Sequence, residues 1–188
     1  MISQALAQLK VWQSENKRIR LCLNISPIQF LDPHFVPFLL HTIDQHGVQP
    51  SQIELEVTES LMLQNLQQVI RDMTQLRDIG ISISIDDFGT GYSALSYLRS
   101  FPIDVVKIDR AFVRSIPEEK QECLLLDGII NLVNSLGMSL IIEGVETRDQ
   151  LAYLQARQCA FIQGYLFSKP LAFDDLVTYL QRVSTHPV

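Results

Sequence analysis

The sequence predicts an α/β fold of the (βα)8 TIM-barrel type, with parallel strands inside and helices outside. Short apolar runs alternate with helical patterns along the chain, and such alternation favours a mainly parallel sheet. Each apolar run also ends in a polar side chain that can take part in chemistry. In a barrel of this type, functional side chains lie where the carboxyl ends of the strands converge. The recurring polar strand ends therefore favour a barrel.

Six apolar runs are expected to form the strands. They cover residues 20–23, 52–55, 79–85, 105–106, 138–142 and 160–162. The polar residues that follow them, in chain order, are Asn24, Glu56 with Glu59, Asp86 with Asp87, Lys107 with Asp109, Glu143 with Glu146, and Gln163. Helical patterns occupy residues 4–15, 37–46, 66–79, 93–100, 121–136 and 148–157. Six strands are about two fewer than a closed barrel of this type contains.

Two adjacent carboxylates, Asp86 and Asp87, stand at the predicted end of the third strand and precede Gly89 and Gly91. Neighbouring carboxylates repel each other and are costly to desolvate, so a cation is the usual remedy. A divalent metal site is one interpretation of this pair. The other is a turn or a helix N-cap before the helix expected from residue 93. The polar residues at the other strand ends favour the metal site.

The composition limits the class of protein. With 188 residues and 47% apolar content, the chain can bury a substantial core, and we expect a single domain over residues 1–188. A net charge of −6 argues against DNA or RNA polymers as partners, although a nucleotide held through metal ions stays open. No apolar run approaches the ~20 residues that span a bilayer, and the first residues lack a signal-peptide pattern. We therefore expect no membrane contact and a cytoplasmic location.

The three cysteines, Cys22, Cys123 and Cys159, are odd in number and far apart along the chain. Two of them lie inside apolar runs. We therefore expect buried thiols rather than disulfides or zinc ligands.

Six short motifs follow one another in a specific order. They are Asn24-Ile25-Ser26, residues 56–60 (Glu-Val-Thr-Glu-Ser), residues 86–93 (Asp-Asp-Phe-Gly-Thr-Gly-Tyr-Ser), Lys107-Ile108-Asp109, residues 143–147 (Glu-Gly-Val-Glu-Thr) and Gln163-Gly164-Tyr165. With these motifs, essentially the whole chain resembles the EAL domain family of cyclic di-GMP phosphodiesterases. The resemblance implies a modified (βα)8 barrel. It also implies hydrolysis of cyclic di-GMP to linear pGpG with two Mg²⁺ or Mn²⁺ ions.

One motif of that family is absent. The sequence contains no Glu-Ala-Leu tripeptide, which lies upstream of the Asn24 motif in complete domains of the family. The resemblance therefore implies a barrel truncated at its N-terminus by about two strands, with this chain as the C-terminal three quarters of a complete domain. We expect the phosphodiesterase activity of such a chain to be impaired.

Carried over position by position, the resemblance implies two metal sites. Asn24, Glu56 and Asp86 would hold one ion, together with the glutamate of the absent tripeptide. Asp86, Asp87 and Glu143 would hold the second ion, so that Asp86 bridges the two. Hard divalent cations prefer oxygen ligands, and two ions about 3.5–4 Å apart can share a carboxylate and an attacking water.

The same resemblance implies catalytic and substrate-binding residues beyond the metal ligands. Lys107 would steady the nucleophile or a phosphate oxygen, and Gln163 would orient the water or a ligand. Glu59 would anchor the loop that follows the paired aspartates. Glu146 and Asp109 would contact the substrate, with Glu146 on its guanine and sugar side.

Several alternatives stay open. Asn24 can cap a turn, Glu59 can be a solvated residue at a helix start, and Lys107 can be an ordinary ion-paired lysine. The chain can also be a cyclic di-GMP receptor that does not cleave its ligand, or an interaction module.

A homodimer is expected from the segment after the paired aspartates. The apolar side chains of this short helical segment exceed what one core-facing stripe requires. They are Tyr92, Leu95, Tyr97 and Leu98.

Overall fold

The central feature of the computed structural model is one parallel sheet of six strands. The structure describes residues 1–14, 19–63, 66–89 and 98–185. The strands are β1 (Leu21–Ile25), β2 (Ile53–Thr58), β3 (Ser82–Phe88), β4 (Val105–Ile108), β5 (Ser139–Ile142) and β6 (Phe161–Ile162). They pair in sequence order, and every neighbouring pair is parallel. The predicted α/β fold is therefore confirmed, and all six predicted strands are present.

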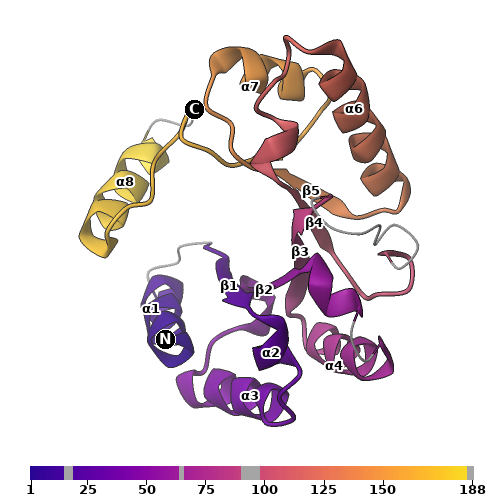
Figure 1. Cartoon of the computed structure of the whole chain (residues 1–188). Helices are drawn as coiled ribbons and strands as arrows, with labels where there is room; N and C mark the ends of the chain where they lie inside the picture. Colours follow the sequence, from indigo (N-terminus) through magenta and orange to yellow (C-terminus); the bar gives the residue numbers. More distant parts are fainter. Residues whose placement is uncertain (15–18, 64–65, 90–97, 186–188) are drawn as a thin grey trace.

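Helices surround the sheet (Figure 1). They are α1 (Ile2–Ser14), α2 (Pro27–Phe30), α3 (Phe35–His46), α4 (Leu66–Asp78), α6 (Lys120–Ser135), α7 (Arg148–Gln155) and α8 (Phe173–Thr185). Short 3-10 segments lie at η1 (Pro50–Gln52), η2 (Glu59–Leu63) and η3 (Arg110–Phe112). Five of the six predicted helices are confirmed with shifted ends, whereas most of the one expected over residues 93–100 lies outside the described residues.

Alternate residues divide the sheet into an apolar face and a polar face. Ile53, Leu55 and Val57 of β2 are fully buried and belong to the hydrophobic core. Because successive side chains of a strand point to opposite faces, the residues between them lie on the other face. That polar face carries Cys22, Asn24, Glu54, Glu56, Ser84, Asp86 and Lys107.

The strands extend further than the apolar runs predict. β3 ends at Phe88, so Asp86 and Asp87 lie inside the strand and not after it. Pairing of Thr58 with Asp86 keeps this part of the chain extended, and the register with β4 shifts between Ile85 and Phe88. Asp87 has a φ of 54° within this irregularity. Bulges of this kind re-aim side chains beside functional sites.

The two ends of the described chain approach each other through an aromatic contact. The rings of Trp12 in α1 and Phe173 in α8 stack with centroids 6.0 Å apart and planes inclined by 20°. Figure 1 shows α8 on the side of the molecule where α1 lies. The sheet order starts at β1 and stops at β6 in the part of the chain that the structure describes, so this contact joins the helix that precedes β1 in the chain to the helix that follows β6.

The prediction that the cysteines are buried needs correction, whereas the expected dimer segment is described only at Leu98. Cys22 is exposed, not buried, because it lies on the polar face of the edge strand β1, while Cys123 and Cys159 are half-buried. Leu98, one of the four apolar residues of the segment expected to support a dimer, is fully buried in the core. The other expected dimer contacts, Tyr92, Leu95 and Tyr97, lie outside the described residues.

Candidate active site

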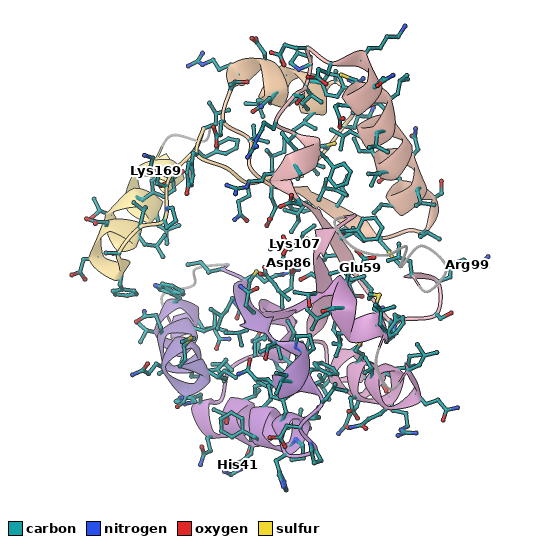
Figure 2. The ribbon with its side chains drawn as sticks, in the orientation of Figure 1. His41, Glu59, Asp86, Arg99, Lys107 and Lys169 are labelled. Carbon is teal, nitrogen blue, oxygen red and sulfur yellow. The ribbon has the colours of Figure 1, made fainter. Side chains whose placement is uncertain are left out.

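Lys107 is the centre of the candidate site. Its Nζ atom lies 3.0 Å from Glu56 Oε1, 3.0 Å from Asp86 Oδ1 and 2.8 Å from Glu143 Oε1. Figure 2 shows Lys107 and Asp86 together near the middle of the molecule, far from His41 on the outer helix α3. We call Lys107 and these three carboxylates the Lys107 cluster.

Neighbouring parallel strands supply the Lys107 cluster. Glu56 is on β2, Asp86 on β3 and Lys107 on β4, and Glu143 directly follows β5. Since parallel strands align their carboxyl ends at one edge of the sheet, side chains near those ends converge. The sequence pattern thus correctly predicts that these four residues come together.

Burial makes the electrostatics of the cluster strong. Desolvation lowers the pKa of Lys107, but hydrogen bonds to Glu143 and Asp86 and the charge of Glu56 outweigh it, so the pKa stays above its ordinary value. Desolvation raises the pKa of Glu143, and the charges of Asp86 and Glu56 add to this against the opposing effect of Lys107. Desolvation also raises the pKa of Asp87, together with the charges of Asp86 and Asp109. The carboxylates around Lys107 thus carry more negative charge than its single ammonium group compensates.

The remaining predicted metal and loop residues lie around this cluster. Asn24 is exposed on β1 and is the register partner of Glu56. Asp87 is exposed at the irregularity of β3. Glu59 is buried at the start of η2, with 8% of its surface exposed, which argues against a merely solvated residue. Most of the loop that Glu59 was expected to anchor lies outside the described residues.

A cavity of about 160 Å³ adjoins the cluster at Glu143. The predicted residues Asp109, Glu146 and Gln163 line it together with Glu143 and Tyr165. The side chain of Asp109 also caps η3, because its Oδ1 accepts a hydrogen bond of 2.9 Å from the backbone N–H of Ala111. The structure thus brings the predicted substrate-binding residues to one place beside the cluster.

Two glycines allow the backbone to come close together at this cavity. A Cβ atom on Gly164 would collide with the backbone of Val145, and one on Gly144 would collide with Arg110. Gly144 also has a φ of 72°, a value that side chains disfavour. Any other residue at these positions would push the lining of the cavity apart.

The donor set of the Lys107 cluster fits divalent cations. Three carboxylates surround one ammonium group, so two negative charges remain uncompensated. Oxygen ligands from carboxylates are those that Mg²⁺ and Mn²⁺ prefer. Glu56, Asp86 and Glu143 would hold such ions, with Asn24 beside Glu56 on the neighbouring strand β1 and Asp87 next to Asp86 on β3.

Cys22 and Glu54 were not singled out as site residues, although they lie next to Glu56. The Cys22 Sγ atom and one carboxylate oxygen each of Glu54 and Glu56 lie within 4.8 Å of one another. Desolvation and the charges of Glu54 and Glu56 raise the pKa of the Cys22 thiol to about 12. The sequence does contain a signal for Cys22 and Glu54. Cys22 lies two residues before Asn24, and Glu54 lies two residues before Glu56. Side chains two residues apart on a strand lie on the same face of the sheet.

The fold and the Lys107 cluster define the class: an α/β-barrel protein with an acidic, lysine-centred site at the carboxyl ends of its strands. The family model described as "EAL domain" matches residues 1–170. The chain therefore belongs to the EAL domain family, which confirms the resemblance noted in the sequence.

Known proteins of this family are similar over most of the chain. Cyclic di-GMP phosphodiesterase NbdA of Pseudomonas aeruginosa is 39% identical over 166 residues, which are 88% of this chain and 21% of that protein. The EAL domain of Mycobacterium smegmatis DcpA superposes with a TM-score of 0.90 at 34% identity, covering 96% of this chain and 82% of that one. Klebsiella pneumoniae BlrP1, solved with manganese and cyclic di-GMP, gives a TM-score of 0.78 at 32% identity, with 89% and 43% covered.

The chain spans about a fifth of the length of the first curated relatives it matches. Among the helices that the structure describes, none is both long enough and apolar enough to cross a membrane.

Proposed function

We propose that this chain carries the catalytic part of a cyclic di-GMP phosphodiesterase, which hydrolyses cyclic di-GMP to linear pGpG. The observation that carries the proposal is the convergence of Glu56, Asp86 and Glu143 on Lys107 at the carboxyl ends of adjacent strands. The name of NbdA and the manganese and cyclic di-GMP complex of BlrP1 support the same substrate and the need for divalent ions. We propose Mg²⁺ or Mn²⁺, two ions, as the cofactors.

The residues of the chain then have distinct roles. Bound divalent ions would lower the pKa of a water and neutralise charge that develops on the phosphate. Asn24, Glu56, Asp86, Asp87 and Glu143 are the proposed ligands, with Asp86 between the two positions. The water oxygen forms a bond to phosphorus, the bond to the 3′ oxygen breaks, and that oxygen takes up a proton.

Lys107 is proposed to neutralise the attacking or phosphate oxygen, since its ammonium lies among the three carboxylates. Gln163, Glu146 and Asp109 are proposed to orient the water and the substrate from the adjoining cavity. Glu59 is proposed to position the loop after β3 from its buried place in η2.

A receptor that binds cyclic di-GMP without cleaving it is the second candidate function. The 188 residues contain no Glu-Ala-Leu tripeptide, so one ligand proposed for the first ion is not among them. We propose that turnover by the 188-residue chain alone is impaired for this reason.

The experiment compares hydrolysis by the chain with hydrolysis by a chimera that carries the N-terminal part of the DcpA EAL domain before Met1. With Mg²⁺ or Mn²⁺, the chimera should produce pGpG at a much higher rate, measured by chromatography. Asp86→Asn in the chimera should abolish turnover and leave the melting temperature nearly unchanged. Normal hydrolysis by that variant would exclude the two-ion assignment, and binding without hydrolysis by the unmodified chimera would favour the receptor.

We propose that residues 1–188 act as one domain in the cytoplasm and form a homodimer through the segment after Asp87. Sedimentation of the chain at high micromolar concentration tests the assembly. A strict monomer would exclude the homodimer.

A further inference from the structure

A second group of metal-ligating side chains lies on the polar face of the sheet, nearer the amino ends of the strands than the Lys107 cluster. It consists of Cys22 on β1 and of Glu54 and Glu56 on β2, with one ligand atom of each within 4.8 Å of the others. Cys22 and Glu54 are register partners in the parallel pair. Glu56 follows Glu54 by two residues, so all three side chains lie on one face.

A buried carboxylate oxygen of Glu54 independently favours a bound cation at this site. Only 1% of its side chain is exposed, and Oε2 pairs with Arg20 Nη1 at 3.0 Å. The other oxygen, Oε1, is buried and has no hydrogen-bond partner among the described residues. A buried carboxylate oxygen without a donor costs free energy, and a bound cation would satisfy it.

The three ligand types point to a thiophilic cation. We propose that Cys22, Glu54 and Glu56 bind one divalent cation of the Zn²⁺ class, at a position that differs from the two oxygen-ligated positions of the Lys107 cluster but shares Glu56 with them. Zn²⁺ commonly takes three protein ligands from sulfur, nitrogen and oxygen, with water as the fourth. Mg²⁺ and Mn²⁺ prefer oxygen alone, so the thiolate selects between the two classes of ion.

Binding of the cation releases one proton and needs only a small movement of the ligand atoms. The S–H bond of Cys22 breaks, a bond forms between sulfur and the cation, and the proton goes to solvent. Ligand atoms around a tetrahedral Zn²⁺ lie about 3.5 Å apart, so no two of the three atoms need to approach each other by more than about 1.3 Å. Cys22 is exposed in the part of the chain that the structure describes, so its side chain can make this movement.

Glu56 links this site to the Lys107 cluster, because its Oε1 also lies 3.0 Å from Lys107 Nζ. A cation held by Cys22 therefore draws Glu56 away from its place in the cluster. Zn²⁺ should in consequence inhibit the Mg²⁺-dependent or Mn²⁺-dependent reaction. This consequence rests on the proposed function, whereas the site itself does not.

The test uses Co²⁺ as a spectroscopic probe for Zn²⁺ in the metal-free 188-residue chain. The wild-type chain should develop a sulfur-to-cobalt charge-transfer band that saturates at one equivalent and disappears on addition of Zn²⁺. Cys22→Ser should remove the band and weaken Zn²⁺ binding at least tenfold by calorimetry. Cys159→Ser, which changes a half-buried thiol before β6, is the matched control and should keep both.

Glu54→Gln should keep the charge-transfer band but weaken Zn²⁺ binding at least tenfold. Circular dichroism establishes that each variant is folded, and Cys22→Ser is nearly isosteric. The site is excluded if the folded wild-type chain shows no band, if the band survives Cys22→Ser, or if Cys159→Ser removes it. Co²⁺ bound to the Lys107 cluster alone gives no sulfur band, so these outcomes are independent of whether the chain hydrolyses cyclic di-GMP.

Discussion

Lys107 Nζ lies 2.8 Å from Glu143 Oε1, the shortest of the three ion pairs that the lysine makes. Lys107 is 6% exposed and Glu143 is 19% exposed, so the pair is largely removed from solvent. One buried ammonium thus compensates part of the charge of three carboxylates. Without divalent ions, the stability of this region depends on that ammonium.

We predict that Lys107→Met lowers the free energy of unfolding in metal-free buffer by about 3 kcal/mol, because it leaves three carboxylates without their cation. Millimolar Mn²⁺ should restore part of this loss, since it supplies positive charge to the same oxygens. Thermal unfolding with and without Mn²⁺ measures both effects. Lys120→Met, at the exposed start of α6, is the control and should change little.

A double variant separates charge from packing in this prediction. Glu143→Gln alone should destabilise the chain, because Lys107 loses a partner. In the Lys107→Met background the same change should stabilise it, because one repelling carboxylate is removed. Equal effects of Glu143→Gln in both backgrounds would contradict the charge-based explanation.

A second prediction concerns pH. Asp127 in α6 accepts hydrogen bonds from Arg157 Nη2 at 2.9 Å and from Tyr153 Oη at 3.0 Å, and the guanidinium carbon of Arg157 lies 3.3 Å from the centroid of the Tyr153 ring. The hydrogen bond from Arg157 holds the pKa of Asp127 below its ordinary value, against the opposing effect of burial. The stabilisation is therefore present above the unfolded-state pKa of about 4 and is lost as the pH falls through the lower folded-state value.

Asp127→Asn should accordingly lower the stability by about 1 kcal/mol at pH 7. Below about pH 4 the difference from the wild-type chain should shrink, because the native carboxyl then also becomes neutral. Urea unfolding at several pH values measures it. Asp44→Asn, on the exposed side of α3, should show no comparable pH-dependent difference, and a pH-independent loss in Asp127→Asn would refute the ionic explanation.

The sequence predicts the strands and the Lys107 cluster because both follow from local patterns. Apolar runs define the strands, and the polar residue after each run lies near a carboxyl end. The pattern of apolar and polar residues does not predict contacts between segments that are distant along the chain. Helix α8 was not predicted, and its aromatic contact Trp12–Phe173 joins the two ends of the chain. The polar face at Cys22 and Glu54 was missed because apolar neighbours such as Leu21, Leu23 and Leu55 made these residues look like part of the core.

The last prediction compares two glycines. At Gly164 backbone atoms block the position of a Cβ atom, whereas at Gly128 this position is open. Gly164→Ala places a methyl group against the backbone of Val145, so the segment with Gln163 and Tyr165 must shift. We expect a lower melting temperature and weaker cyclic di-GMP binding by calorimetry, because both residues line the cavity beside Glu143.

Gly128→Ala is the matched control for Gly164→Ala. A Cβ atom at Gly128 meets no heavy atom within 4 Å in the described part of the chain, and Gly128 lies inside helix α6. Alanine restricts the unfolded chain and suits a helix, so this variant should gain about 0.5–1 kcal/mol of stability. An unchanged melting temperature and unchanged ligand affinity in Gly164→Ala, measured beside this control, would show that the close approach to Val145 does not shape the cavity.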